Sequence, residues 1–460
     1  MSVNVNFLGA AGTVTGSKFL FSSSQSKVLV DCGMFQGIKE LRLKNWEKFP
    51  IQPADIDAVV VTHGHLDHCG YLPRLVKSGF SGKIYMTPWT RDLVQVILLD
   101  SAKLQMEDAE YAEKKGYSRH KKPLPLYDTD DVLKTLNLIE EVKFSTRIQI
   151  TSDTYFTFHP AGHILGAAFV DLEIESKRIL VSGDLGRGNH PLLRDPEPIP
   201  DASFDAILVE STYGDESHTE PDGSFERVIN QTIKRGGSVL IPAFAVDRTE
   251  IILMELRRLV EQQIIPSVPI FVDSPMALQA LEFYRGAIRE KSWEINPEIS
   301  ASEADVFSAG NLTQLQSVEE SKSLNQQRHP CIIISASGMA TGGRVVHHLA
   351  RMLPDAKNSV ILTGYQAVGT RGRSLIDGAK NLKMFGKDVE VHAQIELVDY
   401  FSVHADKDEL VHWLQTARQK PRRVFAIHGD DDTSELFAEY LRTHCGFDAY
   451  APSLEEVIEL

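Results

Sequence analysis

Short apolar runs that end in an acidic residue or a histidine recur along the chain. They lead to Asp31, His63, Asp184, Glu210 and His428. Apolar runs of this length, bounded by turn-forming residues, are typical of buried β-strands. In layered α/β folds, functional side chains gather at the carboxyl ends of strands, where the loops converge. The pattern therefore predicts that these residues, although far apart in the sequence, belong to one site.

The middle of the chain has a different pattern, in which short apolar runs alternate with helix-like stretches. The apolar runs are residues 239–242, 269–273, 331–335 and 359–363, and the helix-like stretches are residues 226–235, 248–262, 276–289 and 343–352. Strands that alternate with helices favour a parallel sheet. We therefore expect an α/β fold in which a parallel-sheet domain, residues 214–375, is inserted into a β-rich domain formed by residues 1–213 and 376–460.

The densest candidate site is the stretch His63-Gly64-His65-Leu66-Asp67-His68, between a predicted strand and a predicted helix. The 460-residue chain has 16 histidines, so three within this stretch are an unusual concentration. Imidazole nitrogens and carboxylate oxygens are ligands that suit Zn²⁺ and similar ions. On extended backbone His63 and His65 can bind one ion, while Asp67 and His68 can turn toward a second. A polar loop without metal is the alternative, and the concentration of histidines argues against it.

A two-ion site needs further ligands, and the downstream strand ends offer them. His163 would complete the ligands of the first ion, His428 would complete those of the second, and Asp184 would bridge the two. The expected ligands of two Zn²⁺ ions per chain are His63, His65, Asp67, His68, His163, Asp184 and His428. Asp31 is a candidate outer partner for one ligating histidine, with a role in capping or in a turn equally open.

Glu210 and His404 are the remaining candidates for proton transfer. Glu210 ends a predicted strand, and it could accept a hydrogen bond from His404. A histidine that an acid orients can serve as the general acid for a leaving alkoxide. The residues alone leave a helix-capping role for His404 open.

Two Gly- and Arg-rich loops follow apolar runs of the middle domain, at residues 335–344 and 364–373. Such turns offer backbone N–H groups to anions, and arginine side chains add positive charge. The candidate phosphate-binding residues are Ser337, Gly338, Arg344, Gly369, Thr370, Arg371 and Arg373. Ordinary strand-to-helix loops are the alternative, and the arginines in both loops favour phosphate binding.

Composition narrows the choice of partner and compartment. The formal net charge of −15 argues against a broad nucleic-acid-binding surface, although bound cations can supply local positive charge. A basic run at residues 114–122 is expected to be a solvated surface rather than a polyanion contact. No apolar run reaches bilayer length, no signal peptide is evident, and the four cysteines show no paired spacing. We expect a cytoplasmic protein with no membrane partner.

With these residues identified, the chain resembles the metallo-β-lactamase superfamily. The motifs that carry the resemblance are His63-x-His65-x-Asp67-His68, His163, Asp184 and His428. More narrowly, it resembles the β-CASP branch, the zinc nucleases related to the cleavage and polyadenylation specificity factor endonuclease. That branch has an acid matching Glu210 and a histidine matching His404, with a small residue often in place of Val403. Its last motif matches His428, where a histidine goes with RNA substrates and an apolar residue with DNA processing.

The resemblance implies an αββα metallo-β-lactamase sandwich with an inserted β-CASP domain, and an RNA substrate in the cleft between them. It implies that a hydroxide shared by two zinc ions attacks the phosphodiester, with catalytic roles for Asp67 and Asp184. His404, oriented by Glu210, would protonate the leaving oxygen and give a 5′-phosphate and a 3′-hydroxyl. The chain starts directly in the catalytic domain, without the KH domains of archaeal relatives, so we expect a compact enzyme of bacterial type.

Two other functions stay open from the sequence. A small-molecule hydrolase of lactamase or thioesterase type is one, although the two phosphate-suited loops argue against it. A non-catalytic RNA-binding subunit is the other, although every expected ligand position is filled. Endonuclease activity is favoured, 5′→3′ exonuclease activity is the other mode, and a homodimer is an open expectation.

Overall fold

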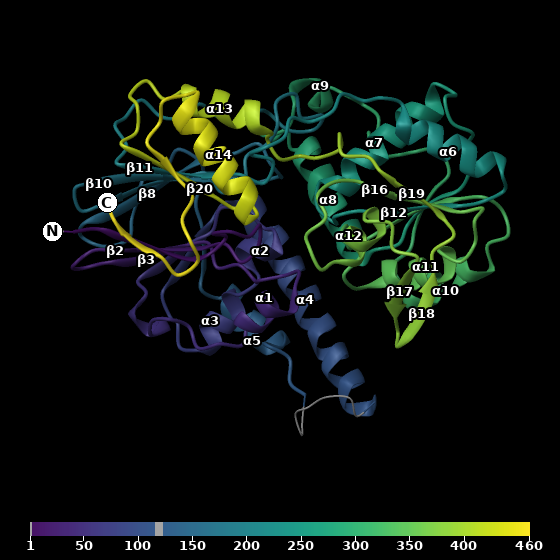
Figure 1. The fold of residues 1–460 in the computed structure, drawn as a ribbon, viewed down its shortest axis with the longest axis horizontal. Helices are drawn as coiled ribbons and strands as arrows, with labels where there is room; N and C mark the ends of the chain where they lie inside the picture. Colours follow the sequence, from purple (N-terminus) through teal and green to yellow (C-terminus); the bar gives the residue numbers. More distant parts are fainter. Residues whose placement is uncertain (1, 116–122) are drawn as a thin grey trace. The chain divides into compact units, whose positions relative to one another are not determined.

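The computed structural model describes residues 2–115 and 123–460, which form two compact units (Figure 1). The terminal unit comprises Met1–Ser217 and His404–Leu460, and the inserted unit comprises His218–Val403. The predicted fold class, an α/β domain inserted into another domain, is confirmed. Of the basic run predicted at residues 114–122, only Lys114 and Lys115 lie within the described residues.

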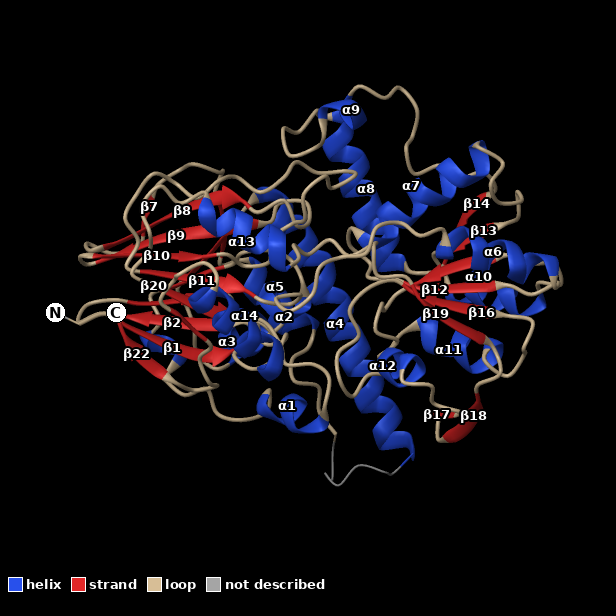
Figure 2. Cartoon of the chain, turned by 45° about the horizontal axis from the view of Figure 1, so that its top comes forward, coloured by secondary structure: helices blue, strands red, loops and turns tan. Residues whose placement is uncertain are grey.

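Two seven-stranded sheets form the core of the terminal unit. The first has the order β22 (Val457–Glu459), β1 (Asn4–Gly9), β2 (Lys18–Ser22), β3 (Lys27–Val30), β4 (Ala58–Val60), β5 (Lys83–Met86), β6 (Ile139–Glu141). The second has the order β21 (Ala449–Tyr450), β20 (Arg423–Ile427), β11 (Ala206–Glu210), β10 (Lys177–Val181), β9 (Ala168–Ile174), β8 (Thr154–Pro160), β7 (Ile148–Gln149). Figure 2 shows these strands as two layers.

Aromatic side chains from both sheets fill the space between the two layers. Phe7 and Phe21 from the first sheet and Phe156, Phe158 and Phe425 from the second belong to one buried cluster. Strand β8 alternates buried and half-buried positions, whereas β11 is buried throughout, so helices must cover its outer face. Helices α3 and α5 lie outside one layer and α13 and α14 outside the other (Figure 1). This is the αββα arrangement that the resemblance implies.

The helices of the terminal unit are short except for one. They are α1 (Lys39–Lys44), α2 (Leu66–Cys69), α3 (Leu72–Lys77), α4 (Pro88–Lys115), α5 (Thr129–Leu136), α13 (Lys407–Gln415) and α14 (Asp431–Thr443), with a 3₁₀ turn at Pro53–Asp55. Capping boxes begin α5 at Asp128 and α13 at Asp406. These caps satisfy N–H groups that the helix itself leaves unpaired.

Three parallel strands bring distant sequence segments to one edge of the second sheet. Val181 of β10 pairs with Leu208 of β11, and Glu210 of β11 pairs with Ile427 of β20. Because parallel strands in register end at the same edge, the residues that follow them meet there.

The inserted unit is built on a six-stranded parallel sheet. Its order is β14 (Leu312–Gln314), β13 (Ile270–Val272), β15 (Ile332–Ser335), β12 (Val239–Pro242), β16 (Ser359–Leu362), β19 (Gln394–Leu397), and β17 (Asn381–Met384) with β18 (Lys387–Glu390) forms a separate hairpin. Its helices are α6 (Ser224–Lys234), α7 (Arg248–Glu261), α8 (Pro275–Arg289), α9 (Pro297–Ser300), α10 (Val318–Ser323), α11 (Arg344–Met352) and α12 (Arg371–Ile376), with a 3₁₀ turn at Leu324–Gln326. The four apolar runs of the middle domain form β12, β13, β15 and β16, as expected.

The inserted unit continues beyond the boundary that the sequence predicts. The predicted boundary is residue 375, whereas the compact unit extends to Val403. Strand β19 explains the difference, because it pairs in parallel with β16 and so completes the sheet of the inserted unit. Its side chains are half-buried or exposed, so it lacks the apolar run that marks the central strands.

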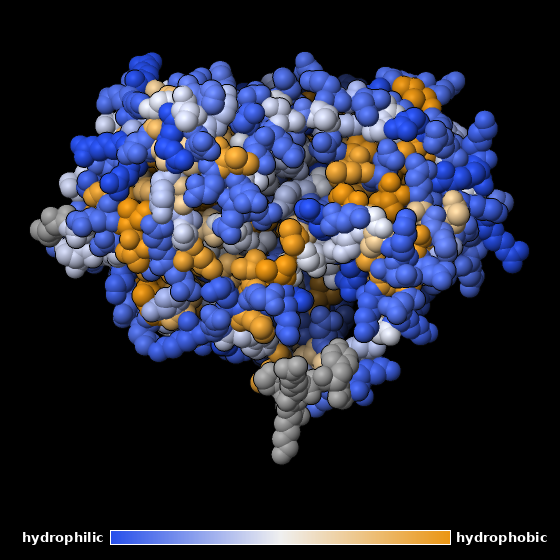
Figure 3. Space-filling view, viewed as in Figure 1, coloured by the Kyte–Doolittle hydropathy of each residue, from blue (hydrophilic) through white to orange (hydrophobic). Residues whose placement is uncertain are grey.

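The hydropathy of the surface is mixed but mainly polar. Hydrophilic residues predominate on the face seen in Figure 3, with smaller apolar areas among them. Within the described residues, no helix combines the length and the apolar character needed to cross a bilayer.

Candidate metal centre and active site

The predicted histidine turn connects strand β4 to helix α2. Val61 and Thr62 continue the chain beyond β4, His63 follows them, and the short helix α2 starts at Leu66. The strand end fixes His63, and the helical turn places Asp67 and His68 on the opposite side of His65. One turn can therefore supply ligands to two neighbouring positions.

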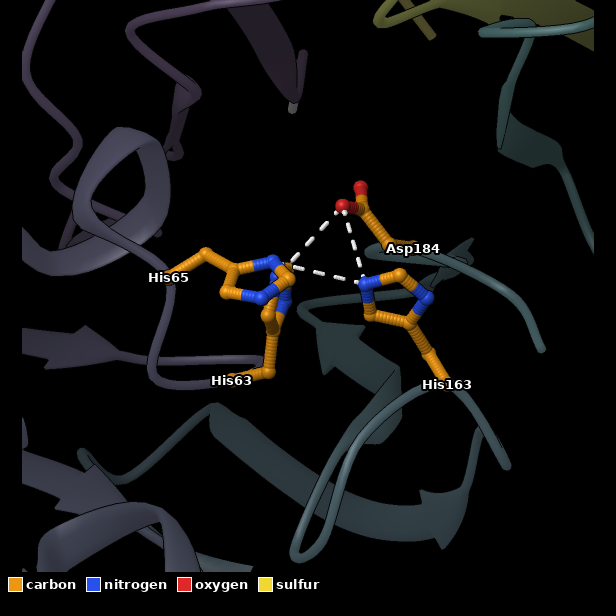
Figure 4. Close-up of side chains that lie close together, drawn as sticks. All are labelled: His63, His65, His163 and Asp184. Carbon is orange, nitrogen blue, oxygen red and sulfur yellow. Dashed lines mark hydrogen bonds and ion pairs between the residues drawn. The ribbon is translucent and has the colours of Figure 1, made fainter. Parts of the chain in front are cut away.

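The first ligand cluster comprises His63, His65, His163 and Asp184, whose side chains converge in Figure 4. His163 Nε2 lies 3.4 Å from His65 Nδ1. Asp184 Oδ2 lies 3.4 Å from His63 Nε2 and 3.6 Å from His163 Nε2. The structure thus brings together the residues that the sequence assigned to the first ion.

The second ligand cluster comprises Asp67, His68 and His428, with Asp184 beside them. His68 Nε2 lies 3.0 Å from His428 Nε2 and 3.2 Å from Asp184 Oδ1. His428 Nε2 lies 3.6 Å from Asp67 Oδ2. Asp184 therefore presents Oδ2 to the first cluster and Oδ1 to the second, so it would be placed to hold an ion at each.

These donor atoms fit metal ions. Ring nitrogens about 2.0–2.1 Å from a tetrahedral Zn²⁺ lie roughly 3.3 Å from one another, close to the separations in both clusters. His63 Nε2 and Asp184 Oδ1 are buried and, apart from the ion-pair contacts given above, make no hydrogen bond with the described residues. Buried polar atoms normally have partners, so two such atoms within one cluster of donors favour a cation.

Electrostatics keeps the imidazoles of the first cluster neutral. Burial lowers the pKa of His65 to about 3, with the neighbouring His63 adding to the effect. Burial also lowers the pKa of His163 well below its usual value, and it lowers that of His63. Neutral imidazoles are the form that binds metal.

The imidazoles of the second cluster have the opposite shift. Burial is the largest single effect and would lower the pKa of His68 and His428, but Asp184 with Asp31 for His68, and Asp184 with Asp67 for His428, together raise both pKa values. Burial likewise opposes the charge of Asp184, but His428 and His68 hold its pKa well below the usual range. The carboxylates around the second cluster thus favour the charged form of its imidazoles, in contrast to the first cluster.

Asp31 lies directly behind the histidine turn, where it accepts four hydrogen bonds. The donors are Thr62 N at 2.8 Å, Thr62 Oγ1 at 3.0 Å, Ser17 Oγ at 3.0 Å and His68 Nδ1 at 2.7 Å. The contact with His68 fixes the ring so that Nε2 faces the second cluster. Of the two roles that the sequence left open, this geometry supports the outer partner of a ligand.

Glu210 and His404 form a pair at the rim of the two clusters. His404 Nδ1 lies 3.1 Å from Glu210 Oε2 and 3.9 Å from Asp184 Oδ2. Glu210 is fully buried and also accepts a hydrogen bond from Leu185 N, whereas the His404 side chain is 16% exposed. Asp406, not His404, caps helix α13, so the capping alternative for His404 is not what the structure shows.

Three family models match successive parts of the chain. They are the metallo-beta-lactamase superfamily over residues 16–236, the Beta-Casp domain over residues 249–375 and the Zn-dependent metallo-hydrolase RNA specificity domain over residues 388–452. The chain is 35% identical to Ribonuclease TTHA0252 of Thermus thermophilus over 92% of each protein. It belongs to the β-CASP family of the metallo-β-lactamase superfamily. The family predicted from the motifs is confirmed.

Archaeal proteins are also among the relatives of this β-CASP protein. It is 32% identical to Transcription termination factor FttA of Methanosarcina mazei, over 93% of this chain and 67% of the relative. It is 31% identical to an RNase J-like protein of Methanocaldococcus jannaschii, over 95% of this chain and 94% of the relative. A crystal structure of an Enterococcus faecalis V583 protein of unknown function matches the full length of both chains with a TM-score of 0.52. At 13% identity, that likeness concerns the fold alone.

The arginines of the two Gly- and Arg-rich loops of the β-CASP protein bind other parts of the inserted unit. Arg344 Nη1 lies 2.7 Å from Asp273 Oδ1, Arg371 Nη1 donates to Thr341 O at 2.9 Å, and Arg373 Nε donates to Asp377 at 2.9 Å. These contacts hold the loops in shape and use part of each guanidinium group. Phosphate binding by the arginines stays a prediction.

The other candidate residues of these loops shape the turns. Ser337 Oγ accepts from Thr341 N at 3.0 Å, and Thr370 caps helix α12 by accepting from Arg373 N. Gly369 has a φ of 82°, which side-chain-bearing residues rarely adopt, and a Cβ at Gly338 would collide with Phe244. The sequence placed these residues in turns correctly, while phosphate binding by them also stays a prediction.

Two threonines of the β-CASP protein that the sequence reasoning missed hold ligand rings in place. Thr62 Oγ1 lies 3.1 Å from His63 Nδ1, and Thr212 Oγ1 lies 3.1 Å from His428 Nδ1. Thr62 directly precedes His63, so its position was a usable signal. Thr212 carried no signal, because only the pairing of β11 with β20 brings it to His428.

Proposed function

We propose that the chain is a zinc-dependent ribonuclease that hydrolyses RNA phosphodiester bonds, with two zinc ions per chain. The observation that carries the proposal is Asp184, which offers one carboxylate oxygen to each of two ligand clusters beside the Glu210–His404 pair. Two-ion sites of this kind suit phosphodiester hydrolysis. The ribonuclease names of two relatives and the RNA specificity domain support RNA as the substrate.

The residues of the chain divide the chemistry among them. When bound, zinc ions supply Lewis-acid activation of the scissile phosphate and of the attacking water. A doubly protonated His404 donates from Nδ1 to Glu210 and gives its Nε2 proton to the leaving 3′ oxygen. The buried Glu210 carboxylate stabilises that imidazolium, and the products are a 5′-phosphate and a 3′-hydroxyl.

A reducing cytoplasm suits this enzyme. The four cysteines are all free thiols, three of them buried. Disulfides persist in oxidising compartments, and thiols in reducing ones. We therefore propose a cytoplasmic enzyme.

Cleavage of end-labelled RNA tests the proposed function. We expect the zinc-loaded protein to cleave RNA, to leave DNA of matched sequence intact and to lose activity when zinc is chelated. RNAs labelled at the 5′ and the 3′ end separate internal cleavage from stepwise removal of nucleotides. Turnover of esters or lactams with intact RNA would replace the proposal by a small-molecule hydrolase, and RNA binding without cleavage or zinc would replace it by a binding subunit.

Acidification should empty the second cluster before the first. His68 and His428 have raised pKa values, so each must lose a proton before its nitrogen binds an ion, whereas His65, with a pKa of about 3, is already neutral. Affinity at the second cluster therefore falls as pH falls, by about tenfold per pH unit for each proton released. Metal content after dialysis at descending pH should pass through one ion per chain. Simultaneous loss of both ions would contradict the assignment.

A further inference from the structure

Lys18 is a buried cation in the terminal unit that none of the roles above uses. It is the first residue of β2, is 4% exposed and precedes the apolar residues Phe19, Leu20 and Phe21. Its Nζ donates to Gly16 O at 2.9 Å and to Gly33 O at 2.7 Å. Burial lowers its pKa to about 8, so the ammonium is still mostly charged at neutral pH. Among the described residues no carboxylate pairs with it, so the two carbonyls are its polar partners.

Aromatic rings complete the surroundings of this ammonium. Nζ lies 4.2 Å from the centre of the Phe35 ring and 5.3 Å from that of Tyr71. Cations are attracted to the faces of such rings. A buried charge is costly unless polar groups satisfy it, and here the carbonyls of two loops do so.

The two loops that Lys18 joins both bind the backbone of the ligand-bearing turn. From the Gly16 loop, Ser17 N donates to Asp67 O at 2.8 Å. From the Gly33 loop, Cys32 N donates to His68 O at 2.8 Å. Gly33 N also donates to Ser17 O at 2.9 Å, which closes the connection between the loops. The backbone of two second-cluster ligands is thus held by two loops that a single ammonium ties together.

We propose that Lys18 is a positioning residue for the second metal ion, acting through the Gly16 and Gly33 carbonyls on the backbone of Asp67 and His68. The proposal rests on the two-ion site of the proposed function. The contacts of the Lys18 ammonium are with two carbonyls and two aromatic rings, none of them on a candidate metal ligand. Its loss should therefore alter how well the second ion binds, more than how the first ion binds.

A cavity beside Lys18 makes the proposal open to chemical rescue. The cavity has a volume of about 420 Å³, is partly open, and is lined by Lys18, Phe35, Asn45, Lys48 and Tyr71 among others. Lys18→Ala would leave room there for a small primary amine. n-Butylammonium carries the charge and length of the missing side chain, and 1-butanol has a similar length without the charge.

The experiment titrates Co²⁺ into the metal-free protein and follows the visible absorption of each bound ion. We expect Lys18→Ala to weaken binding of the second ion by roughly 10–100-fold, as the loss of outer contacts to ligands does. The affinity for the first ion should stay unchanged. n-Butylammonium should restore binding of the second ion, while 1-butanol should not. Lys18→Met, which fills the space without charge, should show the same defect without rescue, and Lys27→Ala, at an exposed lysine of β3, should behave as wild type.

Each other outcome is decisive. If Lys18→Ala binds each of the two ions as tightly as the wild type does, the proposal is overturned. Equal loss of both ions with no rescue by the amine assigns Lys18 to folding and also overturns it. A wild-type chain that binds a single ion refutes the two-ion site of the proposed function, and that result is visible before any variant is made.

Discussion

Replacing His404 by alanine should lower RNA cleavage by about 10²–10⁴-fold and leave the bound metal in place, because general acid catalysis contributes on this scale. His404 Nδ1 lies 3.1 Å from Glu210 Oε2, and the ring belongs to neither ligand cluster. The buried acid holds the ring, and the partly exposed ring can reach a leaving oxygen. Single-turnover cleavage of labelled RNA and analysis of metal content measure the two quantities.

A change of leaving group separates this role from a general loss of activity. A p-nitrophenolate ion departs without a proton, so His404→Ala should hydrolyse bis(p-nitrophenyl) phosphate at close to the wild-type rate. His412→Ala is the matched control, because His412 is an exposed histidine on helix α13. Equal losses on RNA and on the activated ester, or a loss of metal, would argue against His404 as the proton donor.

Replacing Asp184 by asparagine should remove at least one metal ion and lower cleavage by about 10³-fold or more, since the ions supply several kcal/mol of transition-state stabilisation. Asp184 Oδ2 lies 3.4 Å from His63 Nε2, and Oδ1 lies 3.2 Å from His68 Nε2. Asparagine keeps the shape but has a single carbonyl oxygen, so its amide N–H₂ must face one of the clusters. Metal content per chain and the cleavage rate are the measurements.

Asp201→Asn is the matched control for that substitution. Asp201 is exposed and pairs with Arg418, so its replacement should change neither metal content nor cleavage. Two ions retained in Asp184→Asn, with normal cleavage, would remove Asp184 from the bridging position. Two ions retained with slow cleavage would instead limit Asp184 to a catalytic role.

The clustering of the candidate ligands could be predicted from the sequence because their signals are local. The motif His63–His68 is dense in ligands, and Asp184 and His428 each follow an apolar run. Parallel pairing of β10, β11 and β20 then brings the strand ends to one edge, as the general behaviour of such sheets implies. The order in which these three strands lie side by side came from the structure.

Features that depend on tertiary partners could not be predicted in the same way. Arg344 suited a phosphate in the sequence, but Asp273, far away in the chain, occupies one side of its guanidinium group. Strand β19 lies at the edge of its sheet and has no apolar signature, so the sequence placed the limit at residue 375, where the Beta-Casp family model also ends, whereas the compact unit extends to Val403. No sequence signal marked Lys18, because the carbonyls that bind it belong to loops.

The division of the terminal unit by the inserted unit has a consequence for synthesis of the enzyme. A ribosome makes His63, His65, Asp67, His68, His163 and Asp184 before the inserted unit, and His404 and His428 after it. Strand β20, which carries His428 to the others, pairs with β11 from the earlier segment. The nascent chain therefore cannot assemble a complete centre until nearly all of it has been translated, so no unfinished chain holds the full set of candidate ligands.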